Sequence, residues 1–185
     1  GLQALLGSLR TNPYALDSVH LSITTFDSEI KEVLPMTAVV DVILPEIVCP
    51  RSGATLLGEA LERICEQVAR EVRKSTDTAK GDWKPMLVIL TDGKPTDTLA
   101  YSEVIPRVRA AGFAAVVACA AGPKADPTQL TRLTEHVVSL DTMDAASFGK
   151  FFQWVSETVS KDSQSRGSSS AVALPPPPPE INVVL

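Results

Sequence analysis

The chain has 185 residues, and its 22 acidic and 17 basic residues give a net charge of −5 at pH 7. With 44% hydrophobic residues, this length suffices for one full hydrophobic core and predicts a single globular domain. No dense basic block occurs in the sequence, which argues against nucleic acid and anionic lipid as partners. No apolar run approaches the roughly 20 residues that are needed to cross a bilayer.

The three cysteines, Cys49, Cys65 and Cys119, lack the spacing of a zinc site or of a redox pair. Two of them lie inside apolar patterns, which predicts buried and reduced thiols, as is typical of cytosolic proteins. The first residues lack the charged region and the cleavage site of a signal peptide, so we expect a cytoplasmic location.

The first part of the chain predicts a helix followed by two paired strands. Leucines at helical spacing in "GLQALLGSLR" indicate a helix, but no capping residue precedes it, so we expect it to be the end of a helix that began upstream. After the turn "TNPYALD", apolar and polar residues alternate in "VHLSITTFD", and "SEIKEVLPM" follows closely. Pro35 predicts that the second of these strands lies at a sheet edge.

The middle of the chain alternates helices with short apolar runs. From Thr55 to Lys74 apolar residues recur every three to four positions, which predicts a long amphipathic helix. Three later runs are short, continuous and apolar, as strands buried on both faces are: "MLVIL", "FAAVVACAA" and "HVVSL".

Further helices are predicted over about 98–111 and about 145–160, with a short one at "DPTQLTRL", where Asp126 is the expected cap. Strands that alternate with helices predict an α/β domain over residues 1–160, with a mainly parallel central sheet and helices on both faces.

The last residues differ in composition from this domain. Residues 161–174 have the composition of a flexible linker, and the prolines of 175–179 predict an extended rod. The rod and the final "EINVVL" make up a third segment, 175–185. Because this ending is too apolar to be left free, we expect it to fold back onto the domain.

Two loops carry oxygen-bearing side chains at the predicted carboxyl edge of the sheet, where ligands of such folds bind. Asp92 directly follows "MLVIL" in the stretch "TDGKPTD", and Thr55 opens the long helix in "SGATLLGEAL". A hydroxyl and a carboxylate suit magnesium, which keeps several of its waters. A purely structural role is open for both, since either could cap the helix beside it. Asp97 is the predicted cap of the helix that follows it.

These residues resemble the von Willebrand factor A family. "SGAT" at a helix start, followed by an apolar strand that ends in "TDG", is similar to the family's metal-ion-dependent adhesion site, and the order of elements agrees with its Rossmann-like fold. By this resemblance Thr55 and Asp92 bind Mg²⁺, or else Mn²⁺ or Ca²⁺. The same resemblance implies a partner-binding rim made of Ser52, Gly53, Gly93 and Lys94.

The family's other metal ligands lie in an Asp-x-Ser-x-Ser loop after its first strand, and this sequence contains no such loop. The resemblance therefore implies that the first strand and its loop precede Gly1. Without that loop we expect metal binding to be weak or absent.

Within the family, the length, the loop wording and the ending look most like the bacterial TerY-like proteins of tellurite resistance and stress response. This resemblance implies a protein partner with an acidic or phosphorylated group, such as a kinase or a PP2C-type phosphatase. We expect a metal-dependent protein-binding module and not an enzyme.

Two alternatives to this function remain. One is a magnesium-dependent phosphoryl-transfer enzyme that uses Asp92 with Lys94 beside it, although neither a P-loop nor G-x-G-x-x-G occurs. The other is a metal-free interaction scaffold that acts through the proline rod and the tail.

Overall fold

The computed structural model describes residues 1–48, 53–92, 94–122, 125–142, 144–164, 174–179 and 181–184, with the backbone alone for 161–164. The helices are α1 (Leu2–Thr11), α2 (Pro13–Ser18), α3 (Leu57–Glu71), α4 (Thr98–Ala110), the 3₁₀ turn η1 (Leu130–Arg132) and α5 (Ala145–Gln164). The strands are β1 (His20–Phe26), β2 (Ile30–Ala38), β3 (Met86–Thr91), β4 (Ala115–Ala121), β5 (His136–Leu140) and β6 (Asn182–Val184).

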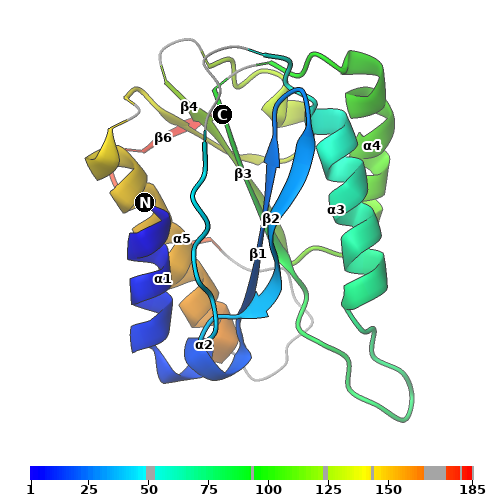
Figure 1. Ribbon diagram of the computed structural model, residues 1–185, viewed down its shortest axis with the longest axis vertical. Coiled ribbons are helices and arrows are strands. Elements are labelled where there is room, and N and C mark those ends of the chain that lie inside the picture. Colours follow the sequence, from blue (N-terminus) through cyan, green and yellow to red (C-terminus); the bar gives the residue numbers. More distant parts are fainter. Residues whose placement is uncertain are drawn as a thin grey trace.

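The strands form two sheets (Figure 1). In the larger sheet β3, β4 and β5 are parallel, and β6 runs antiparallel to β5. In the smaller sheet β1 and β2 form an antiparallel hairpin. The predicted α/β fold with a central sheet flanked by helices is confirmed. The prediction that Pro35 lies in an edge strand is also confirmed, because β2 pairs only with β1 among the described strands.

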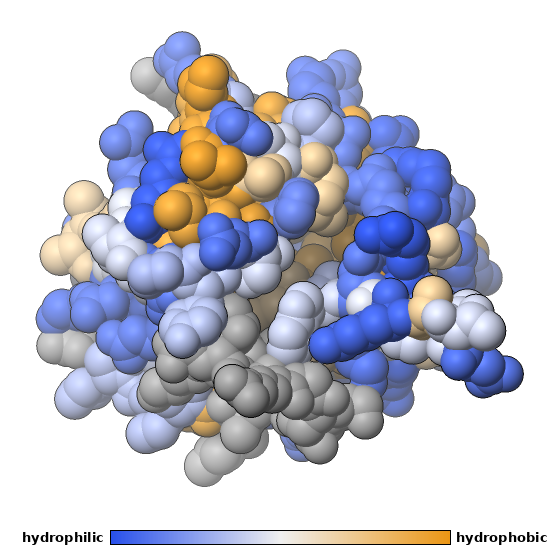
Figure 2. Space-filling view, turned by 90° about the horizontal axis from the view of Figure 1, so that it is seen from below, coloured by the Kyte–Doolittle hydropathy of each residue, from blue (hydrophilic) through white to orange (hydrophobic). Residues whose placement is uncertain are grey.

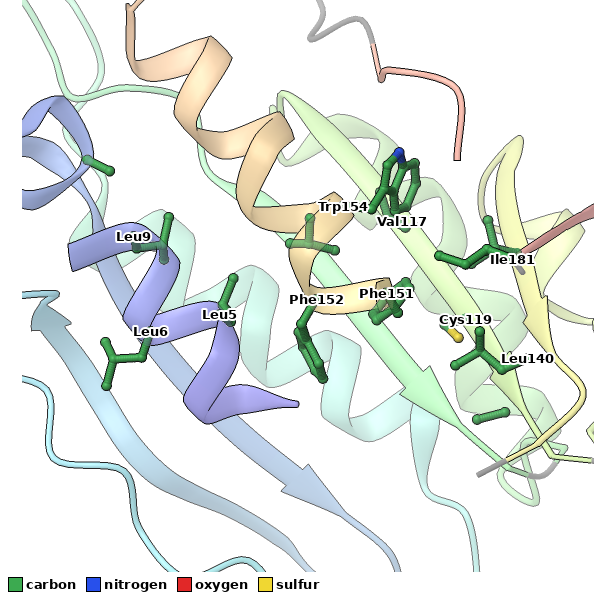
Figure 3. Packing of buried hydrophobic residues seen from close by; sticks show 14 of the residues in the cluster. Leu5, Leu6, Leu9, Val117, Cys119, Leu140, Phe151, Phe152, Trp154 and Ile181 are labelled. Atoms are coloured by element: carbon green, nitrogen blue, oxygen red, sulfur yellow. The ribbon is translucent and has the colours of Figure 1, made fainter. Parts of the chain in front are cut away.

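Helices cover both faces of the strands (Figure 1). On one face α1 and α5 pack together, and Figure 3 shows Phe151 of α5 directed toward Cys119 of β4. On the other face α3 and α4 form a second core, with Leu61 and Tyr101 packed against the sheet. Alternate residues of β4 enter the two cores, so that Val117 lies in the first and Ala118 in the second. This burial on both faces is what the continuous apolar runs predicted.

Among the described strands, β1 pairs only with β2 and β3 pairs only with β4. Ile23 of β1 and Val88 of β3 pack against the same core, so the two sheets lie between the same helical layers. Figure 3 shows the arrows of β1 and β3 pointing in the same direction. Leu87 and Val88 are only half-buried. Because successive residues of a strand face opposite sides of the sheet, exposure of both indicates an open edge and not one uncovered face.

The lower face of the molecule carries apolar surface. Val40 is 56% exposed and Ile43 is 86% exposed in the coil that follows β2. Figure 2 shows hydrophobic residues gathered on this side, and a recess near the middle of the face has hydrophobic residues inside it.

Two local predictions are corrected. The predicted turn "TNPYALD" contains helix α2, because the Asn12 side chain accepts backbone N–H groups of its first turn and Pro13 occupies its first position. The helix predicted at "DPTQLTRL" is a single 3₁₀ turn, before which the Asp126 carboxylate accepts the N–H of Thr128. In both segments the capping residues decide the local structure.

The long helices also differ in their limits from the predictions. Helix α3 begins at Leu57, two residues after Thr55, and ends at Glu71. Helix α5 continues to Gln164, so that the first four residues of the predicted linker are helical. Residues 165–173 of that linker lie outside the described part of the chain.

The apolar tail folds back onto the domain, as the sequence predicted. Ile181 is 4% exposed in the first core, and the three residues of β6 pair with β5. The indole nitrogen of Trp154 donates to the carbonyl oxygen of Pro175 at 2.9 Å, which fixes the start of the proline rod. The side-chain amide of Asn182 donates to the carboxylate of Asp141. The tail therefore supplies a strand to the larger sheet.

Cys65 and Cys119 are free and buried, as predicted, whereas Cys49 lies outside the described residues. Burial raises the pKa of the Cys119 thiol to about 12. None of the helices in the described part of the chain has the length and apolar character that a membrane-spanning helix requires.

Candidate functional site

The structure joins the loop that carries Thr55 to the loop that carries Asp92. The N–H of Thr55 donates to the side-chain oxygen of Thr96 at 3.0 Å. The N–H of Thr96 donates in return to the carbonyl oxygen of Thr55, also at 3.0 Å. Because Thr96 and Asp92 belong to the same connection between β3 and α4, the two predicted ligand loops lie side by side at the carboxyl edge of the sheet.

Asp97 makes a second connection between the same two segments. Its Oδ2 accepts the backbone N–H of Glu59, in the first turn of α3, at 2.9 Å. Asp97 occupies the N-cap position of α4, but its side chain makes no capping hydrogen bond there. The prediction that Asp97 caps its own helix is therefore wrong, because the carboxylate caps the neighbouring helix. Its other oxygen, Oδ1, is buried and has no hydrogen-bond partner among the described residues.

Thr55 does not cap α3. The N-cap residue is Leu56, and no side chain of this position bonds to the helix. The N–H of Leu56 donates to the carbonyl oxygen of Asp27 at 3.1 Å, which ties the loop to the end of β1. Half-buried Thr55 is thus held through its backbone. In the described part of the structure its hydroxyl has no hydrogen bond.

Asp92 does not cap the next helix either. Helix α4 begins at Thr98, and its N-cap position is five residues beyond Asp92. The Asp92 side chain is exposed. Within the described residues no hydrogen bond or ion pair engages its carboxylate. The alternative interpretation of Thr55 and Asp92 as helix caps is therefore wrong.

The predicted rim is described in part. Lys94 Nζ lies 2.7 Å from Asp126 Oδ2, although the lysine side chain is 65% exposed. This contact, together with hydrogen bonds from Thr128, holds the pKa of Asp126 below its usual range. Gly53 is exposed, and a Cβ added there would meet no atom within 4 Å. Ser52 and Gly93 lie outside the described residues.

The donor set has the chemistry of a magnesium site but supplies only part of one. A threonine hydroxyl and an aspartate carboxylate are the hard oxygen ligands that Mg²⁺ takes, and this ion retains several waters. Among the described residues no group of three or more His, Cys, Asp or Glu side chains is placed to hold a metal. Thr55 and Asp92 fit an ion whose other coordination positions are filled by water and by further oxygen-bearing groups.

Comparison with known proteins agrees with the observed fold. The family described as von Willebrand factor type A domain matches residues 2–154. No curated protein matches the chain in sequence. Among solved structures the chain is similar to proximal thread matrix protein 1 from the mussel byssus, in its crystal form 2, with a TM-score of 0.54 and 16% identity. The similarity covers 83% of this chain but only 40% of that protein, and at this identity it concerns the fold alone.

Proposed function

Because the chain belongs to the von Willebrand factor type A family, we propose that it is a metal-dependent protein-binding module whose ion lies between Thr55 and Asp92. One observation carries the proposal. Both side chains are free of structural bonds within the described residues, while their neighbours Thr96 and Asp97 make the bonds that join the two loops. Two oxygen ligands are thus left available at the edge where ligands of α/β sheets bind.

The proposed ion is Mg²⁺, with Mn²⁺ or Ca²⁺ as alternatives. The Thr55 hydroxyl and the Asp92 carboxylate would hold it, with water and further groups completing the coordination. When bound, the ion supplies a positively charged position that a carboxylate or phosphate of a partner can occupy. Lys94 stands on the same loop and is 65% exposed, but its ammonium group lies 2.7 Å from the Asp126 carboxylate. The attraction of an acidic partner is therefore assigned to the ion and not to Lys94.

The proposed partner is a protein with an acidic or phosphorylated group, in the cytoplasm of a bacterium. Sequence resemblance to TerY-like proteins supports a place in tellurite resistance or stress response, beside a kinase or a PP2C-type phosphatase. This finer assignment rests on that resemblance and not on the geometry of the edge.

We propose no catalytic activity for the chain. Phosphoryl transfer would need an assembled nucleophile, base and phosphate-binding loop. The nearest second carboxylate in the sequence, Asp97, is engaged as an acceptor for Glu59 and does not pair with Asp92. The alternative scaffold would present a free tail, but Ile181 is buried and β6 belongs to the sheet.

The test is a titration of the full chain with Mn²⁺, a paramagnetic substitute for Mg²⁺, followed by NMR. We expect the amide signals of Thr55 and Asp92 to broaden first, and excess Mg²⁺ or chelator to restore them. Asp92→Ala should remove the effect. Asp141→Ala is the matched control, because Asp141 also directly follows a parallel strand but accepts a bond from Asn182. Broadening that survives Asp92→Ala would contradict the proposed site.

Partner binding is tested with immobilised chain and a library of peptides that contain glutamate or phosphoserine. Bound peptides should be released by chelator and should not bind the Asp92→Ala variant. Peptide binding that is indifferent to both would favour the metal-free scaffold. Magnesium-dependent hydrolysis of a phosphoester that is lost in Asp92→Ala would instead favour the enzyme.

A further inference from the structure

We propose that Asp97 is a positioning residue that sets Thr55 against Asp92, an inference that rests on the proposed function. It would act through the start of α3 and would not touch the ion itself. Three observations support this role: the hydrogen bonds that cross between the two loops, the close approach of α3 to α4, and the use of the Asp97 carboxylate away from its own helix.

The crossing hydrogen bonds fasten Thr55 from both sides. The reciprocal bonds with Thr96, each 3.0 Å long, fix the backbone of Thr55 itself. The bond from Glu59 to Asp97, 2.9 Å long, fixes the first turn of α3 that follows. We call Thr96, Asp97 and these three bonds the clamp. The loop that bears Asp92 therefore also carries the groups that hold Thr55.

Helix packing behind the clamp prevents α3 from sliding. A Cβ built on Gly58 would lie 2.2 Å from the backbone nitrogen of Tyr101 and 2.6 Å from the carbonyl carbon of Ala100. The two helices thus touch backbone to backbone at the first turn of each. With α3 in this register on α4, the clamp decides where the residues just before α3 are placed.

The electrostatics favour a carboxylate at this position. The first turn of α3 has unsatisfied N–H groups and the positive end of the helix dipole, and Asp97 brings a negative charge to it. A hydrogen bond to an ionised acceptor is shorter and stronger than a neutral one. Opening the clamp would release the residues just before α3 from this loop and would separate Thr55 from Asp92, while α3 stays packed on α4.

The experiment compares Asp97→Ala with Asp97→Asn in the full chain, by Mn²⁺ titration and by amide hydrogen exchange. In Asp97→Ala we expect Mn²⁺ to broaden Asp92 still, broadening of Thr55 to be lost, and apparent Mn²⁺ affinity to fall about fivefold. The Glu59 amide should exchange faster. Asp97→Asn keeps an acceptor oxygen and should restore much of both properties.

The matched control is Asp144→Ala, which removes a comparable acceptor at the start of α5, where Asp144 Oδ1 accepts the N–H of Ser147 at 2.8 Å. It should lower the melting temperature without changing the broadening of Thr55. If Asp97→Ala does not fold, Thr96→Val replaces it in the experiment. This variant removes only the side-chain oxygen that accepts the Thr55 N–H.

The outcomes separate the two proposals. Equal broadening of Thr55 and Asp92 in the parent and in folded Asp97→Ala would overturn the positioning role while leaving the metal site intact. If the parent shows no broadening at either residue, the proposed function is wrong. Amide exchange then tests by itself whether Asp97 holds the two loops together. Exchange of Glu59 and Thr55 that is no faster in Asp97→Ala than in Asp144→Ala would show that Asp97 holds nothing in place.

Discussion

At the scale of single residues, Gly58 shows how closely α3 and α4 approach. An added methyl group would overlap backbone atoms of Tyr101, and backbone cannot rotate away as a flexible side chain can. Gly7 in α1 is also a helical glycine, yet a Cβ there would meet no atom within 4 Å. The two glycines therefore have different physical roles within the same type of element.

We expect Gly58→Ala to lower the free energy of unfolding by about 1–3 kcal/mol, because the methyl group forces the helices apart. Gly7→Ala should raise it by about 0.5–1 kcal/mol, because alanine favours the helix and adds no contact. Urea denaturation followed by circular dichroism measures both. A neutral Gly58→Ala would mean that the two helices are not in backbone contact.

The lowered pKa of Asp144 leads us to expect that the stability of the fold depends on pH. A hydrogen bond from the Ser147 N–H, and then one from Thr142, hold the pKa of Asp144 below its ordinary value of 3.8. A group whose pKa is lower in the folded state stabilises the fold at pH values above its pKa in the unfolded chain. This stabilisation is lost as the pH falls through its pKa in the folded chain. Asp144→Asn should therefore be less stable than the parent at pH 6.

The difference between parent and Asp144→Asn should shrink as the pH falls below about 4, because the carboxylate then takes up a proton in the unfolded chain before it does so in the folded one. Thermal melts at pH 6 and pH 3 measure it. Asp141→Asn is the control. Asp141 lies on the same edge but, among the described residues, accepts its hydrogen bonds from the Asn182 side chain and not from the first turn of a helix. A difference that is the same at both pH values would contradict the role of the ionised carboxylate.

At the scale of elements, the sequence predicts best where burial alone decides the structure. The continuous apolar runs identify β3, β4 and β5, because such runs fit strands covered on both faces. Helix α2 is missed, because six residues are too few for a periodic pattern and its start depends on the Asn12 cap. The cap by Asp97 is missed because its partner Glu59 is 38 residues away. Such a bond exists only after α3 has packed on α4.

The docked tail, which contains Ile181 and strand β6, allows a test at the scale of an element. Ile181 is 4% exposed, whereas Val183, two residues on, is 51% exposed. Ile181→Ala should lower the free energy of unfolding by about 2–4 kcal/mol, since it removes buried methyl groups from the first core. Val183→Ala should change it by less than about 0.5 kcal/mol. Equal effects in denaturant titrations would mean that the tail does not dock as an ordered strand.

At the scale of the whole molecule, the division of the strands into two sheets leaves β1 and β3 each with one edge that pairs with no other strand in the described part of the chain. Strand β4, in contrast, is paired on both sides, with β3 and with β5. Unpaired edges are normally a liability, because their free N–H and C=O groups can pair with other chains. Residues of both sheets pack in the same two cores, which lie against the helices on either side (Figure 1).

Amide hydrogen exchange tests this division directly. In a parallel ladder alternate residues of a strand bond to the same neighbour, so β3 should show protected amides that alternate with faster-exchanging ones. Every amide in the middle of β4 should be protected, which makes β4 the internal control. Strand β1 should alternate as β3 does, because it bonds only to β2. Slow exchange at every residue of β3 would mean that both of its edges are hydrogen-bonded, and the separation of the two sheets would then be wrong.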